Sequence, residues 1–105
     1  MIEVRFKIFN SGTFKFSCKG HAGADVEGKD LVCAGASALA YGLLENVIES
    51  EEMFIEGNWK EDKGLIKITF KPKPEFVNSM CLLFTAFRNA FKLLEKSNKK
   101  FIKVW

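Results

Sequence analysis

The sequence is poor in the residues that build metal sites and disulfide frameworks. Its 105 residues include one histidine, His21, and three cysteines, Cys18, Cys33 and Cys81, without paired spacing. A single histidine excludes any two-histidine metal motif, and an odd number of scattered cysteines favours neither a disulfide framework nor a four-cysteine zinc site. Reduced thiols in a cytoplasmic protein fit this usage best, so we expect no metal and no cofactor.

Long apolar runs and a large net charge are also missing. No stretch reaches the roughly 18 consecutive apolar residues of a membrane helix, and the N-terminus alternates instead of showing a basic and then apolar leader. Sixteen Lys and Arg against thirteen Asp and Glu give +3, which is too small to indicate nucleic-acid binding by itself. With 48% hydrophobic residues, the chain has enough apolar material for one core. We expect a single soluble domain over residues 1–105, without membrane contact or direct nucleic-acid binding.

The hydrophobic pattern of the first half predicts a hairpin followed by a helix. Apolar residues at every second position from 2 to 8 and from 14 to 18, with turn residues at 10–12, predict two paired strands that point Cys18 inward. Asp30 is a candidate N-cap for a helix that ends at about Ser50. The apolar face of this helix is expected to consist of Val32, Ala36, Leu39, Leu43 and Val47.

The second half repeats this order. Residues 53–60 and 65–71 flank a loop at 61–64 and predict a second hairpin, which Pro72 and Pro74 end. A second helix is expected from Glu75 to Lys96, and residues 101–105 can add a short last strand. The apolar residues of this second helix lie three and four positions apart and are Val77, Met80, Phe84, Phe87, Phe91 and Leu94. The order ββαββα(β) predicts a two-layer α+β fold, an antiparallel sheet with both helices packed on one face.

The other face of this sheet is expected to be basic. It would display Arg5, Lys7, Lys15, Lys19, Lys67 and Lys71. Such a surface can steer an anionic or ribosome-associated partner, but lysines on open strand faces are more typical of a solvated face that resists edge pairing. The chain also lacks the aromatic-glycine signature of an RNA-recognition sheet. A non-enzymatic RNA- or ribosome-binding module, in which His21 and Cys33 are incidental, therefore stays as the alternative function.

Reactive side chains gather between the second strand and the first helix. His21 begins a glycine-rich loop, and Cys33 falls in the first helical turn if Asp30 is the N-cap. There, unpaired backbone N–H groups and the helix dipole stabilise a thiolate, and the same N–H groups can stabilise an oxyanion. His21 can take the thiol proton and give it to a leaving amine. This combination predicts a cysteine nucleophile with a histidine base.

Inert packing is the competing interpretation of these residues. A cysteine beside small apolar residues is usually buried without function, and a lone loop histidine is often only solvated. Ser37, one turn after Cys33, either hydrogen-bonds near the thiol or fills space. A three-ligand metal site of Cys18, His21 and Cys33 is a further alternative, which the inward position of Cys18 disfavours. Cys81 is expected to pack in the core.

Two segments resemble the motifs of a known family, the bacterial ribosomal-processing cysteine proteases called Prp. They are Gly20-His21-Ala22-Gly23 and residues 30–39, Asp-Leu-Val-Cys-Ala-Gly-Ala-Ser-Ala-Leu, and the resemblance covers essentially the whole chain in element order and length. It implies that His21 and Cys33 are the catalytic dyad and that Ser37 corresponds to the family's helix-borne serine. Gly35 stands where the family often has alanine, which leaves the nucleophile's context intact. The supporting or flap residues implied are Gly20, Ala22, Gly23, Asp30, Ala34 and Ser37.

The resemblance also implies a substrate and an assembly. Members of the family remove a short N-terminal extension from ribosomal protein L-twenty-seven, cleaving after a hydrophobic, phenylalanine-containing stretch, and they are homodimers. The glycine-rich loop, residues 22–28, would be a flap that orders over the substrate peptide, since glycines let a loop change conformation at little cost. The expected partners are thus an extended ribosomal protein and a second copy of the chain.

Overall fold

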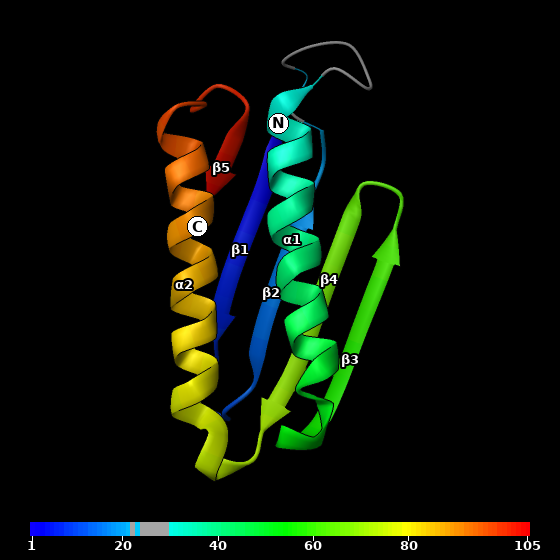
Figure 1. Ribbon diagram of the computed structural model, residues 1–105, viewed down its shortest axis with the longest axis vertical. Coiled ribbons are helices and arrows are strands. Elements are labelled where there is room, and N and C mark those ends of the chain that lie inside the picture. The colour runs from blue at the N-terminus through cyan, green and yellow to red at the C-terminus, as the bar shows by residue number, and fades with distance from the viewer. Residues whose placement is uncertain (22, 24–29) are drawn as a thin grey trace.

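A computed structural model describes residues 1–21, 23 and 30–105. It contains one five-stranded sheet and two long helices, and both helices lie on the same face of the sheet (Figure 1). The elements in chain order are β1 (Ile2–Ile8), β2 (Phe14–Lys19), α1 (Leu31–Glu49), β3 (Phe54–Asp62), β4 (Leu65–Pro72), α2 (Val77–Lys96) and β5 (Ile102–Val104), with 3₁₀ turns at Glu51–Met53 and Pro74–Phe76. The predicted two-layer α+β fold is confirmed.

The strand order is β3-β4-β2-β1-β5, and one strand pair differs from the expected antiparallel sheet. The pairs β1–β2, β2–β4 and β3–β4 are antiparallel, whereas β5 runs parallel to β1. The sheet is therefore mixed. Figure 1 shows the reason: α2 carries the chain back to the end of the sheet at which β1 starts, so β5 runs in the same direction as β1.

The second hairpin is longer and tighter than predicted. Its first strand continues to Asp62, which pairs with Leu65 at the start of β4. Residues 61 and 62, expected in a loop, are thus part of β3, and only Lys63 and Gly64 form the turn. A two-residue turn is sufficient to connect antiparallel strands. The extra strand length brings the tip of the hairpin to the end of the molecule where α1 begins.

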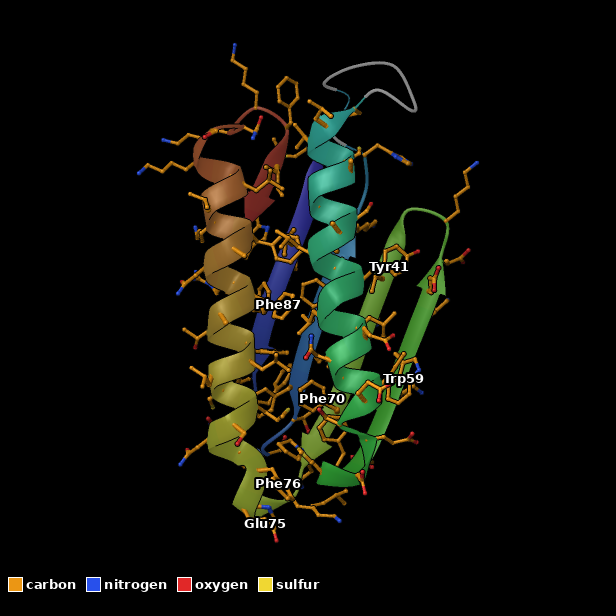
Figure 2. The ribbon with its side chains drawn as sticks, in the orientation of Figure 1. Tyr41, Trp59, Phe70, Glu75, Phe76 and Phe87 are labelled. Carbon is orange, nitrogen blue, oxygen red and sulfur yellow. The ribbon has the colours of Figure 1, made fainter. Side chains whose placement is uncertain are left out.

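Aromatic side chains fill the space between the sheet and the helices. Phe14, Phe16 and Phe70 from the sheet and Phe91 from α2 are each at most 1% exposed, and such burial contributes roughly 2–3 kcal/mol per ring before entropy costs. The helix α1 brings smaller side chains to this core than α2. A methyl group at its Gly42 would lie 3.3 Å from the ring of Phe87 of α2, so the two helices pack closely where Phe87 points toward α1 (Figure 2).

The buried face of α1 is wider than the sequence indicated. Val32, Ala36, Leu43 and Val47 are buried as expected and Leu39 is half-buried, while Ala40 and Leu44 are buried in addition. With a mean hydropathy of 1.5 over its apolar window, α1 is long and apolar enough to cross a membrane. The sequence prediction that no membrane-spanning stretch exists was based only on uninterrupted runs of apolar residues, whereas the mean hydropathy also counts windows that include small polar residues. In this structure α1 packs on the sheet, which is the arrangement of a core helix.

Candidate active site

The first turn of α1 is fixed by its N-cap. The Asp30 carboxylate accepts hydrogen bonds from the backbone N–H groups of Val32 and Cys33, both at 3.0 Å, and Asp30 is only 9% exposed. The Asp30 carbonyl accepts the N–H of Ala34, also at 3.0 Å. The predicted cap is confirmed, and it holds Cys33, half-buried, in the first helical turn.

The same hydrogen bonds correct one expectation about catalysis. The sequence predicts that the N–H groups of this first turn are unpaired and therefore ready to stabilise an oxyanion. In the structure those of Val32 and Cys33 both donate to the Asp30 carboxylate, because an N-cap side chain satisfies the donors that a helix start would otherwise leave open. Stabilisation of an oxyanion in this state has to come from other donors.

His21 is placed by the end of β2. The preceding residue, Gly20, has φ +102° and its N–H donates to the Gly64 carbonyl at 2.9 Å. This bond ties the chain just before His21 to the turn between β3 and β4. A Cβ built on Gly64 would lie 3.5 Å from the His21 Nε2, so the imidazole lies directly against that turn.

Cys33 and His21 line one pocket of about 150 Å³. The pocket lies between the start of α1, the end of β2 and the tip of the β3–β4 hairpin, three segments that Figure 1 shows at one end of the molecule. Its other lining residues are Ile2, Cys18, Gly20, Ala36, Ser37, Ala40, Tyr41, Asp62, Gly64, Leu65 and Ile66. A thiol, an imidazole and a hydroxyl thus share one partly open, largely apolar cavity, which is the set of groups that thiol-dependent acyl transfer needs.

Comparison with known families identifies the protein class. The model of the cysteine protease Prp family matches residues 1–103. The chain belongs to this family. It is therefore a cysteine protease, as the resemblance of its motifs indicated. No curated protein matches the chain by sequence.

Several solved structures share this fold. The chain is similar to an essential ribosomal processing protease Prp from Staphylococcus aureus in complex with a covalently linked product peptide, with 21% identity, a TM-score of 0.75, and coverage of 99% of this chain and 97% of that chain. The same protease in complex with a substrate peptide gives 20% identity, a TM-score of 0.72, and coverage of 100% and 98%. A Streptococcus mutans protein gives 24% identity, a TM-score of 0.66, and coverage of 99% and 91%.

Cys18 also lines the pocket that contains Cys33 and His21, although the sequence indicated only core packing for it. It is half-buried against the core from β2. Burial, and then the neighbouring Cys33 thiol, raise the pKa of Cys18 to about 11, so Cys18 is a neutral thiol at neutral pH. The described residues contain no cluster of three or more His, Cys, Asp or Glu side chains that could hold a metal ion. The three-ligand alternative therefore finds no support in the part of the chain that the structure describes.

The pocket is also lined by residues that sequence reasoning missed. Tyr41 of α1 donates a hydrogen bond to Glu61 of β3 at 2.5 Å, which raises the pKa of Tyr41, and Asp62 lies beside it in the pocket wall. Figure 2 shows Tyr41 directed from α1 toward the β3–β4 hairpin. Cys33, Ser37 and Tyr41 follow at intervals of four on one helical face, so this polar stripe was visible in the sequence. The hairpin residues gave no local signal.

The remaining predicted residues have different positions relative to the pocket. Gly20 and Ser37 line the pocket. Asp30 acts on it indirectly as the cap, while Ala34 is exposed and is not part of the pocket wall. Ala22 and residues 24–28 of the predicted flap lie outside the described residues, and Gly23, which is described, is exposed with φ +69°.

Proposed function

We propose that this protease is a cytoplasmic endopeptidase that removes the N-terminal extension of the large-subunit ribosomal protein L-twenty-seven, with Cys33 as nucleophile and His21 as its base and acid. The observation that carries the proposal is the shared pocket of these two side chains. His21 is the single histidine of the chain, and histidine is the side chain that most readily exchanges protons near neutral pH. The assignment of the dyad also agrees with the motif resemblance.

In the first half of the reaction, His21 accepts the proton of the Cys33 thiol. The thiolate sulfur attacks the scissile carbonyl carbon and forms the S–C bond, and electrons move to the carbonyl oxygen. When the tetrahedral intermediate collapses, the C–N bond breaks and His21 gives its proton to the departing amine. The new N-terminus of the mature substrate leaves, and a thioester joins the extension to Cys33.

In the second half, water hydrolyses the thioester. His21 accepts a proton from water, and the resulting hydroxide forms a C–O bond with the thioester carbon. The C–S bond then breaks, the extension leaves with a free C-terminal carboxyl group, and His21 returns its proton to the Cys33 sulfur. Ser37 lies one turn after Cys33 in the same pocket, and its hydroxyl is a donor for the substrate carbonyl oxygen. This hydroxyl can stabilise the oxyanion by a hydrogen bond, which the N–H groups of Val32 and Cys33 cannot do while they donate to the Asp30 carboxylate.

The walls of the pocket suit an apolar peptide segment. Ile2, Leu65 and Ile66 contribute aliphatic surface beside the reactive groups. Such surface favours the hydrophobic, phenylalanine-containing stretch that the family resemblance implies before the cleaved bond. The Staphylococcus aureus relatives, a ribosomal processing protease with substrate or product peptide, support the same class of substrate. We further propose that the active form is a homodimer.

A cleavage assay tests the proposal. Purified protein is incubated with the extended ribosomal protein and, separately, with the mature form, and the products are identified by mass spectrometry. We expect cleavage of the extended form only, at one bond, and loss of at least about a thousandfold in kcat/KM in Cys33→Ala and in His21→Ala, since removing a nucleophile or its base typically costs several orders of magnitude.

A third variant controls for cysteine loss. Cys81→Ala removes a half-buried thiol of α2 that does not line the pocket, and it should retain activity within a fewfold of the wild type. All variants are first checked for a cooperative thermal transition. Full activity in Cys33→Ala, or equal loss in Cys33→Ala and Cys81→Ala with all proteins folded, would refute the assignment of the nucleophile.

A further inference from the structure

The face of the sheet that the helices leave uncovered has a charge pattern that proteolysis does not explain. We call it the open face and define it by the outward-pointing side chains of the five strands. Residues directly opposite each other in paired strands point to the same side of a sheet, so the strand registers give the rows of this face. The first row reads Asn58, Thr69, Lys15, Lys7, and the second reads Lys60, Lys67, Ser17, Arg5.

These two rows hold five cations and no carboxylate. Lys7 lies directly opposite Lys15, and Lys60 lies directly opposite Lys67. Like charges in such positions destabilise a sheet. Within residues 1–21, 23 and 30–105, the ion pairs are Arg5–Glu3, at 3.7 Å, and Lys92–Glu95. No described carboxylate lies within ion-pair distance of the four paired lysines, so they repel one another, and a bound anion would relieve this repulsion.

Protection against aggregation can account for Lys60, which lies on the edge strand β3, but not for the lysines of the interior strands. Lysine is common on edge strands, where it blocks pairing with another chain. The edge strands here are β3 and β5, whereas Lys15 and Lys67 lie on β2 and β4 in the interior of the sheet. Interior strands have no free edge to protect. The positive charge of the open face thus requires another explanation.

The open face is hollowed where the lysines meet. Lys15, Lys60 and Lys67 line a shallow depression of about 360 Å³ together with Asn58 and Thr69. Three ammonium groups, an amide and a hydroxyl offer hydrogen-bond donors to an anionic oxygen. This composition is typical of a surface that follows a phosphate backbone.

Exposed aromatic rings accompany these cations. Phe9 is 39% exposed, and the ammonium groups of Lys7 and Lys15 each lie 5.6 Å from the centre of its ring. Trp105 is 50% exposed, and the Arg5 guanidinium carbon lies 4.5 Å from its ring centre. Rings beside cations provide stacking platforms for unpaired bases, as in proteins that bind single strands.

We propose that the open face binds single-stranded nucleic acid, with the lysine rows contacting phosphates and Phe9 and Trp105 stacking on bases. A duplex would hide its bases from the two rings, and an acidic peptide without aromatic residues would give them nothing to stack on. The net charge of +3 is too small to indicate this binding by itself, but the fold places five cations in two adjacent rows of the open face. The proposal is independent of the proteolytic function.

Fluorescence anisotropy with a labelled oligouridine of about 12 nucleotides tests the proposal. The wild type should bind at low salt. A plot of the logarithm of the association constant against the logarithm of the salt concentration should have a slope of about −3.5 for five phosphate contacts. The triple variant Lys15→Gln, Lys60→Gln, Lys67→Gln should bind at least tenfold more weakly, with a slope shallower by about 2. Phe9→Leu should weaken binding severalfold without changing the slope.

A second triple variant provides the matched control. Lys96→Gln, Lys99→Gln, Lys100→Gln removes the same charge from exposed positions outside the strands, and its affinity should stay within about threefold of the wild type. Equal loss in both triple variants, or no binding by the wild type at low salt, overturns the proposal. Oligothymidine, polyglutamate and phosphatidylserine vesicles are measured in parallel. Binding of oligothymidine agrees with the proposal, whereas polyglutamate or vesicles binding as tightly as RNA overturns it.

Discussion

Gly20 provides the sharpest test of how the active site is positioned. Its φ of +102° is a conformation that favours glycine, and a Cβ built on it would lie 2.5 Å from the Met1 carbonyl oxygen. That oxygen belongs to backbone that cannot easily move, because the next residue, Ile2, is 2% exposed and its N–H donates to the Phe101 carbonyl at 2.8 Å. Gly20→Ala therefore forces either β1 or the end of β2 to shift.

The expected loss of stability has two parts. Holding a residue other than glycine at positive φ costs roughly 1–2 kcal/mol, and relieving an overlap with packed backbone costs roughly 1–3 kcal/mol more. The reduced entropy of the unfolded alanine chain offsets about 0.4–1 kcal/mol. Together these terms predict that Gly20→Ala lowers the free energy of unfolding by about 1–5 kcal/mol. Gly23→Ala is the matched control, because Gly23 also has positive φ, +69°, but a Cβ there meets nothing within 4 Å.

Gly20→Ala should lower activity as well as stability. Gly20 directly precedes His21, and its N–H is the link to the Gly64 carbonyl, so a shift at Gly20 displaces the imidazole from Cys33. Urea denaturation gives the two free energies of unfolding, and cleavage of the extended substrate under folding conditions gives kcat/KM. We expect a loss of at least tenfold in kcat/KM for Gly20→Ala, since small displacements in an active site are costly. Equal stability of the two alanine variants, with full activity in both, would refute the reasoning.

Three further predictions concern the thiols and the C-terminal strand. Iodoacetamide at pH 7 should label Cys33 at least tenfold faster than Cys18, whose pKa is raised to about 11 by burial and by Cys33, because the thiolate is the reactive form; equal labelling in a peptide map would contradict this. Since the Cys18 thiol has an ordinary pKa of 9.0 in the unfolded chain and a pKa of about 11 in the folded one, the wild type should lose up to about 2 kcal/mol of stability between pH 9 and 11. Cys18→Ala should lose less over that range, and parallel curves would count against the shift. Finally, Glu95→Ala should destabilise by about 1–3 kcal/mol, because the Glu95 carboxylate accepts the N–H of buried Val104 at 2.7 Å. Lys92→Ala, which removes only an ion pair to Glu95, should cost at most about 1 kcal/mol in the same denaturation assay.

The parts of the site that depend on neighbouring residues were predictable from the sequence. The N-cap places Cys33 through contacts that span three positions, from Asp30 to the Cys33 N–H. The alternation of β1 and β2 likewise fixes the position of His21 at the end of a hairpin. Each of these follows from the preferences of a few consecutive residues, which a single sequence contains.

Contacts between distant segments were not predictable in the same way. The β3–β4 hairpin closes the pocket, but its turn, with Gly64, lies far along the chain from His21, and no local pattern specifies their contact. The parallel pairing of β5 follows from the path of α2. The alternation in the sequence correctly predicted that Arg5, Lys7, Lys15 and Lys67 share the open face, but their order across the sheet depends on how β2 pairs with β4. Such features result from tertiary packing, which propensity and periodicity do not encode.

Strand β2 connects the two surfaces of the molecule through its alternation. Phe14, Phe16 and Cys18 point toward the helices, while Lys15 and Lys19 point to the open face. A slip of one residue would place the lysines in the core and the phenylalanines in solvent. Phe14 and Phe16 are at most 1% exposed, so their burial opposes this slip strongly. The register that packs the core therefore also aims Cys18 at the pocket and Lys15 at the open face, so the sheet separates the proposed site of cleavage on one side from the positive charge on the other.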